Sequence, residues 1–98
     1  MAVVMNMRWN GVTPEQYDAV RKIVNWEGDR PEGSIHHVAW FDDAGARVVD
    51  LWETAEDFQR FVDERLMAGV AQAGVQGQPD VEIQPAHAIY APNEVARV

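Results

Sequence analysis

The stretch Ser34–Glu53, SIHHVAWFDDAGARVVDLWE, predicts two β-strands joined by a tight turn. Glycine adopts left-handed backbone conformations without a Cβ clash, so the segment Asp43–Gly45 suits a three-residue hairpin loop. Such a loop would pair Asp42 with Ala46. Side chains that are directly opposed in an antiparallel pair share a face of the sheet. The predicted hairpin therefore determines which side chains of the two strands lie together.

The two faces of this hairpin are predicted to differ in composition. One face would carry His36, Val38, Trp40, Asp50 and Trp52, and the other would carry Ile35, His37, Ala39, Phe41, Val49 and Leu51. A register shifted by one residue would place His37 instead of His36 beside Asp50, and the sequence leaves both registers open. Because both faces are rich in apolar residues, we expect both to be covered.

The composition predicts one folded domain. The 98 residues are 47% hydrophobic and include four tryptophans, which is too apolar for a disordered chain. We expect a single domain over residues 1–98, with a core at about residues 2–91. A short C-terminal tail, Pro92–Val98, is expected to be mobile or packed on a partner. A core of this size is only marginally sufficient alone, so association would stabilise it.

Charge and cysteine content exclude several classes of function. The formal net charge of −8 argues against a nucleic-acid partner, because binding to nucleic acid needs a clustered positive surface. The absence of cysteine excludes disulfides, thiolate zinc sites and a cysteine nucleophile. The sequence has no metal-ligand spacing, so no metal is expected. It also has no secretory leader and no membrane-spanning run, and we expect a cytoplasmic protein without a membrane partner.

The segment before the hairpin predicts a strand and a helix. Val3–Trp9 is rich in valine and methionine and ends at a turn signal, which is typical of a strand. Thr13 is a predicted N-cap, and Gln16 is placed to complete a capping box. The apolar side chains that follow recur at helical spacing, so an amphipathic helix is predicted to about Trp26.

The segment after the hairpin predicts a second helix and a last strand. Thr54 is a predicted N-cap, and an apolar stripe follows it, formed by Phe58, Phe61, Val62, Leu66 and Val70. Val81–Tyr90 alternates between apolar and polar residues and is predicted to be a strand. Proline cannot donate to a sheet ladder, so Pro85 places this strand at an edge or at a bulge.

This order of elements predicts an α+β fold. Strand, helix, strand, strand, helix, strand is the ferredoxin-like βαββαβ arrangement, a four-stranded antiparallel sheet with two helices on one face. Helices can cover only one of the two apolar sheet faces. The simplest cover for the other face is the same sheet of a second copy, so we expect a homodimer packed sheet to sheet.

The run Trp52–Phe58, WETAEDF, carries the third strand into the second helix. With this run and this order of elements, the chain resembles the dimeric α/β-barrel superfamily and, more narrowly, proteins of the antibiotic-biosynthesis-monooxygenase type. The resemblance covers roughly residues 2–91. It implies a dimeric α/β barrel in a family that includes cofactor-free oxygenases of aromatic polyketides, haem-degrading enzymes, small-metabolite isomerases and members without assigned activity. The fold does not choose among these activities.

The haem-degrading branch of this family implies a specific set of residues. An asparagine on the first strand and a tryptophan ending the third strand are matched by Asn6 and Trp52. The histidine on the second helix is not matched, because Phe58–Glu64 contains none, and the axial ligand of a haem iron would be missing there. No cofactor is therefore expected.

Four polar residues are the candidates for catalysis. A histidine beside Asp50, either His36 or His37, could act as a general base that the carboxylate orients. Asn6 could hydrogen-bond a developing oxyanion. Each of these residues also has a structural interpretation, as a histidine bound to the backbone or a partner, or as a carboxylate in a buried ion pair.

Four aromatic residues are the candidates for binding. Flat apolar walls with polar edges would suit a planar aromatic ligand, and the residues that could form them are Trp40, Trp52, Tyr17 and Trp26. Two functions stay open. One is a cofactor-independent monooxygenase or related enzyme acting on a small aromatic or polyketide-like substrate. The other is a non-catalytic small-ligand-binding or stability protein of the same fold.

Overall fold

The structure, a computed structural model, describes residues 1–92. Its elements in chain order are β1 (Val3–Asn10), α1 (Pro14–Val24), β2 (Ser34–Asp42), β3 (Gly45–Trp52), α2 (Ala55–Phe61), the π-helical segment η1 (Val62–Leu66), α3 (Met67–Ala73) and β4 (Asp80–Pro85). This order confirms the predicted βαββαβ arrangement. The predicted tail lies outside the described residues from residue 93 onward.

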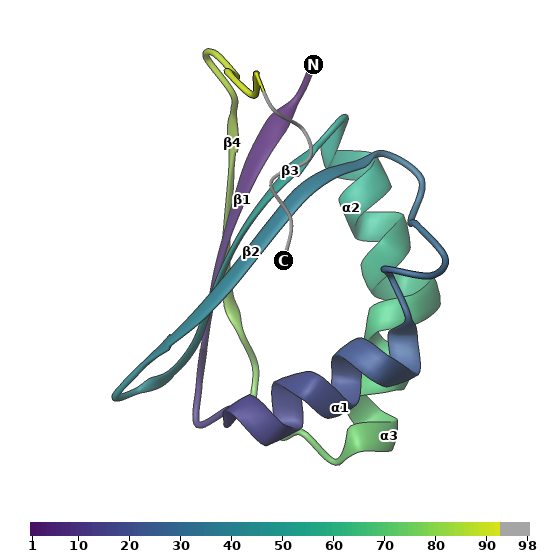
Figure 1. The fold of residues 1–98 in the computed structure, drawn as a ribbon, viewed down its shortest axis with the longest axis vertical. Coiled ribbons are helices and arrows are strands. Elements are labelled where there is room, and N and C mark those ends of the chain that lie inside the picture. Colours follow the sequence, from purple (N-terminus) through teal and green to yellow (C-terminus); the bar gives the residue numbers. More distant parts are fainter. Residues whose placement is uncertain (93–98) are drawn as a thin grey trace.

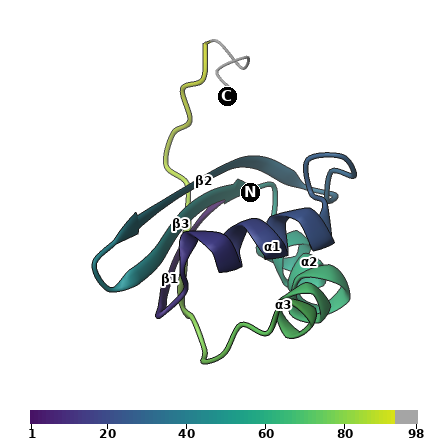
Figure 2. The ribbon, with the colours of Figure 1, turned by 60° about the horizontal axis from the view of Figure 1, so that its bottom comes forward.

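The four strands form one antiparallel sheet in the order β2-β3-β1-β4, and the helices lie on one face of it (Figure 1). The edge position of β4 confirms the prediction made from Pro85. The strand ends at Pro85, however, and not at Tyr90 as predicted. The pairing of β4 with β1 ends at Pro85 opposite Val3, the N–H of Ala86 still donates to Ala2, and the chain then extends away from the sheet (Figure 2).

Side-chain alternation along β1 separates the two faces of the sheet. The residues that face the helices are buried, and they are Val3, Met5, Met7 and Trp9. Asn6 and Arg8 are exposed on the other face. The hydrophobic core thus lies between the sheet and the helix layer, and the outer face of the sheet is open in the single chain.

Local chemistry sets the helix ends. Thr13 and Gln16 form the predicted capping box, and Thr54 caps α2 as predicted. α1 ends at Val24, short of the predicted Trp26, because Asn25 takes a left-handed conformation with φ of 59°. The second helical run passes through the π-helical η1 before it ends at Gly74.

The packing of α1 against α3 requires a glycine. Gly69 is buried at this contact, and a Cβ atom there would overlap the side chain of Val24. The two helices can therefore approach closely at this point. Within residues 1–92 no helix is long and apolar enough to cross a membrane.

The register of the β2–β3 hairpin differs from the main prediction. Asp42 pairs with Gly45, not with Ala46, so the loop has two residues instead of three. The Asp42 carboxylate stabilises this tighter turn. It accepts hydrogen bonds from the backbone N–H groups of Ala44, at 2.8 Å, and Gly45, at 3.1 Å. These hydrogen bonds, the one from Ala44 above all, lower the pKa of Asp42. The one-residue shift brings His37, and not His36, opposite Asp50.

Candidate functional site

An apolar cavity of about 180 Å³ lies between the sheet and the helices. Its walls come from β1, β2, β3 and the helices. Aromatic and aliphatic side chains dominate them, among others Met5, Trp9, Tyr17, Trp26, Trp52, Phe58, Phe61 and Leu66. Three ionisable residues of the central hairpin, His36, His37 and Asp50, also line it. A mostly apolar cavity with a few converging polar groups is the usual form of a small-molecule site.

His37 and Asp50 form the polar centre of this cavity. They are directly opposed on β2 and β3, and His37 Nδ1 lies 2.7 Å from Asp50 Oδ1. The Asp50 side chain is only 8% exposed, whereas that of His37 is 31% exposed. An ionised carboxylate can only accept hydrogen bonds, so we assign the proton to Nδ1 of His37. The lone pair of the neutral ring then lies on Nε2.

Trp52 forms a hydrogen bond with the second oxygen of the Asp50 carboxylate. Its indole Nε1–H donates to Asp50 Oδ2 at 3.0 Å, so both oxygens of this buried group are hydrogen-bonded. The indole ring is 3% exposed and packs against Phe58 and Phe61, with ring centroids 5.6 and 5.4 Å away. Trp52 thus orients Asp50 as well as lining the cavity.

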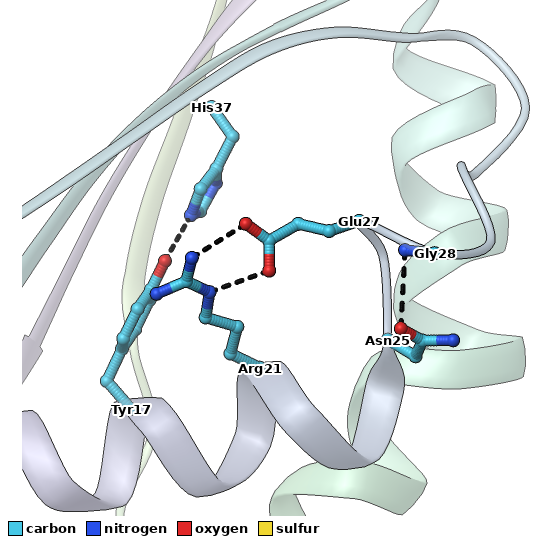
Figure 3. Close-up of polar contacts among 6 residues, drawn as sticks. All are labelled: Tyr17, Arg21, Asn25, Glu27, Gly28 and His37. Carbon is cyan, nitrogen blue, oxygen red and sulfur yellow. Dashed lines mark hydrogen bonds and ion pairs between the residues drawn. The ribbon is translucent and has the colours of Figure 1, made fainter. Parts of the chain in front are cut away.

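Tyr17 completes the hydrogen-bonded chain from the helix side. Its hydroxyl lies 2.7 Å from His37 Nε2, so it donates to the ring nitrogen that Asp50 leaves free (Figure 3). The two ring planes are nearly parallel, with an interplanar angle of 5° and ring centroids 6.1 Å apart. Trp26 and Phe41 pack around the phenol ring, each with its centroid 5.9 Å away. Burial raises the pKa of Tyr17 to about 12, so the phenol stays neutral and donates a hydrogen bond at neutral pH.

The ion pair between Arg21 and Glu27 lies next to this chain of hydrogen bonds, near the C-terminal end of α1. Arg21 donates two hydrogen bonds of 2.7 Å to the carboxylate of Glu27 (Figure 3). Arg21 lowers the pKa of Glu27 chiefly through these bonds. In the sequence this pair is signalled only by two opposite charges six residues apart, and it was not predicted.

His36 lies at the irregular start of β2. The pairing shifts between Ser34 and His36, so that His36 is opposite Leu51. The residue lines the cavity, and its Nε2 atom is buried without a hydrogen-bond partner among residues 1–92. A buried polar group without a partner is costly, but the strand register directs His36 to the face of Leu51 and not to the face of His37 and Asp50.

The sheet separates two of the predicted site residues from this group. Asn6 was expected on a buried face, but it is exposed on the outer face, opposite Val49 and Glu82. Trp40 lies on the same outer face, opposite Arg47, and is 47% exposed. Neither side chain lines the cavity. The structure thus brings together the predicted residues His37, Asp50, Trp52, Tyr17 and Trp26, with His36 beside them, but not Asn6 or Trp40.

A metal centre is not formed by the described part of the chain. Among residues 1–92 there is no group of three or more histidine and carboxylate side chains that could hold a metal ion. The chemistry available at this cavity is proton transfer at His37 Nε2, next to an apolar space that can hold a planar molecule.

Comparisons with known proteins support the fold. No family model matches the sequence, and no curated protein matches it. Among solved structures, a protein of unknown function from Nitrosomonas europaea matches with a TM-score of 0.67 and 15% identity over 94% of this chain and 95% of that one. SnoaB, a cofactor-independent oxygenase from Streptomyces nogalater, matches with a TM-score of 0.61 and 14% identity over 94% and 97%.

A third solved structure carries the family description itself. A candidate antibiotic biosynthesis monooxygenase from Chloroflexus aurantiacus matches with a TM-score of 0.60 and 16% identity, over 94% of this chain and 97% of that one. At sequence identities this low, the structural similarity indicates a shared fold but not a shared activity. The chain therefore shares the fold of these solved structures, which include a cofactor-independent oxygenase and a candidate antibiotic biosynthesis monooxygenase.

Proposed function

We propose that this protein binds a small aromatic molecule in the cavity and that His37, oriented by Asp50, acts on it as a general base without a cofactor. The observation that carries the proposal is the hydrogen bond of 2.7 Å between His37 and the buried Asp50 in the wall of an apolar cavity. A buried carboxylate with an imidazole partner is the arrangement that orients a catalytic histidine. The likeness to SnoaB, a cofactor-independent oxygenase, supports oxygenation as the reaction.

The volume of the cavity limits the size of the ligand. An apolar cavity of about 150 Å³ is enough to bind benzene. A cavity of about 180 Å³ therefore suits a molecule of one or two rings and is small for a multi-ring polyketide. Trp26 and Trp52 would contact the faces or edges of such a ring system.

The proposed reaction needs only the substrate, molecular oxygen and a base. His37 Nε2 takes the hydroxyl proton of a phenol such as 1-naphthol, which leaves an electron-rich phenolate. The phenolate ring gives an electron pair to O2, a C–O bond forms, and the result is a ring hydroperoxide. In forming this hydroperoxide, protonated His37 returns its first proton to the peroxide oxygen. His37 Nε2 then takes the proton of the ring carbon while the O–O bond breaks, which gives naphthoquinone. The distal oxygen leaves as hydroxide, takes this second proton from His37 and becomes water. One naphthol and one O2 thus give one naphthoquinone and one water.

Asp50→Asn tests the role of the carboxylate. An asparagine that keeps its oxygen towards Trp52 presents its NH2 group to His37 Nδ1, which must then accept a hydrogen bond. The imidazole proton moves to Nε2, and the base is lost although the shape is kept. We expect a folded protein whose turnover of 1-naphthol falls by several orders of magnitude, as for a triad histidine held in the wrong tautomer. Nitrogen NMR of His37 reads the tautomer directly, and an unchanged tautomer with unchanged turnover would remove Asp50 from the mechanism.

Binding without chemistry is the second candidate function, and one observation favours it. Both nitrogens of His37 and both oxygens of Asp50 have protein partners within the described chain, as in a purely structural network. Single-turnover mixing of the protein with 1-naphthol and oxygen separates the two functions. Naphthoquinone formation supports the enzyme, and binding without product supports the binding protein.

We also propose that the outer face of the sheet packs against a second copy of the chain. By the strand register, five apolar residues share this face, namely Val4, Val38, Trp40, Val49 and Leu51. Val38 is 58% exposed and Trp40 is 47% exposed. A contiguous apolar patch with side chains this exposed is unusual on a monomeric protein. An isologous contact between two such faces would cover both patches.

Trp40→Glu is expected to dissociate this dimer, because it would bury a carboxylate at the centre of the contact. At micromolar concentration the parent should sediment at twice the chain mass of 11.0 kDa, and the variant at the mass of one chain. Met67→Glu is a matched control, since Met67 is 46% exposed but lies on α3 in the helix layer. A parent that sediments as a single chain would refute the dimer.

A further inference from the structure

The base in the cavity already has a partner in this structure. His37 Nδ1 is bound to Asp50 Oδ1, so the acid–base capacity of the neutral ring rests on the single lone pair of Nε2. That lone pair accepts a hydrogen bond of 2.7 Å from the hydroxyl of Tyr17 (Figure 3). A substrate hydroxyl can reach Nε2 in line only if the Tyr17 hydroxyl moves away.

Tyr17 resembles, in its chemistry, the ligand proposed for the site. Its side chain is a neutral phenol with a pKa raised to about 12 by burial, so it donates to His37 without losing its proton. Its ring lines the cavity and packs against Trp26 and Phe41, as a bound aromatic ring would. It reaches His37 from α1, on the helix layer, whereas His37 and Asp50 belong to the sheet.

We propose that the Tyr17 hydroxyl occupies the position of the ligand hydroxyl at His37 Nε2, so that Tyr17 is an internal competitor of a phenolic ligand. This inference rests on the proposed function, since it assumes that the cavity takes an aromatic molecule. It narrows the ligand class to hydroxylated one- or two-ring aromatics, whose hydroxyl replaces that of Tyr17. Aromatic hydrocarbons of the same size would fill the apolar space without displacing the tyrosine.

Removal of the competitor should strengthen the binding of a phenol. Tyr17→Phe keeps the ring and its packing but frees Nε2, so 1-naphthol no longer has to break the hydrogen bond between Tyr17 and His37. We expect the variant to bind 1-naphthol about two- to tenfold more tightly, the factor that corresponds to one hydrogen bond of ordinary net strength. Naphthalene, which has no hydroxyl, should bind the parent and the variant equally.

Titration calorimetry without oxygen tests the inference, because turnover then cannot occur. Tyr90→Phe serves as the matched control, since Tyr90 is 90% exposed and should leave both affinities unchanged. If 1-naphthol binds Tyr17→Phe as the parent or more weakly, Tyr17 is not a competitor. A parallel gain for naphthalene also overturns the inference, because the change would then come from cavity shape. If neither compound binds any variant, the proposed function itself fails, and this inference fails with it.

Discussion

Replacement of Trp52 by alanine is expected to lower the free energy of unfolding by about 3–5 kcal/mol. The indole is 3% exposed and packs on Phe58 and Phe61, so its removal leaves a void where β3 meets the helix layer. It also leaves Asp50 Oδ2 without its hydrogen-bond donor. A domain of this size is held by about 5–15 kcal/mol in total, so the variant should be only marginally folded.

Trp52→Phe separates the two contributions of the tryptophan. Phenylalanine keeps one aromatic ring in the core, and it removes the N–H group that binds Asp50 together with part of the indole volume. We expect it to destabilise the protein by about 1–3 kcal/mol, the usual cost of leaving a buried polar group unsatisfied. Denaturant unfolding of both variants gives the two values. If Trp52→Ala unfolds like the parent, this residue does not support the core as described.

His37→Gln is expected to lower the turnover of 1-naphthol by about 10²- to 10⁴-fold, the range that a general base contributes. Glutamine has an N–H group that can still donate to Asp50, but it has no basic atom. The effect should appear in kcat, because the proton transfer belongs to the chemical step, while the apolar walls of the cavity remain.

Oxygen consumption and naphthoquinone formation measure this loss. His87→Gln is the matched control, because His87 is exposed beyond the end of β4, and its turnover should equal that of the parent. A His37→Gln variant that keeps the turnover of the parent would exclude His37 as the base.

The elements that local chemistry determines could be predicted from the sequence. Thr13 and Thr54 cap their helices through hydrogen bonds within four residues, and these caps placed both helix starts correctly. Pro85 indicated an edge strand because its missing N–H is a property of the residue itself. The order of these elements then led to the fold.

The hairpin register could not be predicted, because the sequence suits a loop of two residues as well as one of three. In the two-residue loop the Asp42 carboxylate accepts hydrogen bonds from two backbone N–H groups of the turn, which stabilises it. This choice moved Trp40 to the outer face and brought His37 to Asp50. The sequence analysis had left that second pairing open as the alternative register.

The link between Tyr17 and His37 also lay beyond the sequence. The two residues are twenty positions apart and belong to different layers, and their contact depends on how α1 lies over β2. Asn6 was misplaced for a different reason. In β1 the apolar residues Met5, Met7 and Trp9 alternate with polar ones, and this visible pattern puts Asn6 on the face that carries Arg8.

Binding of 4-nitrophenol measures the acid–base role of the cavity directly, because its phenolate and phenol forms absorb at different wavelengths. At a pH below the pKa of the free compound, the parent protein should convert the bound phenol to phenolate as His37 Nε2 takes its proton. His37→Gln should bind the compound without this spectral change. If 4-nitrophenol binds to the parent but stays in the neutral form, or does not bind at all, the cavity is not the site of a histidine base acting on phenols.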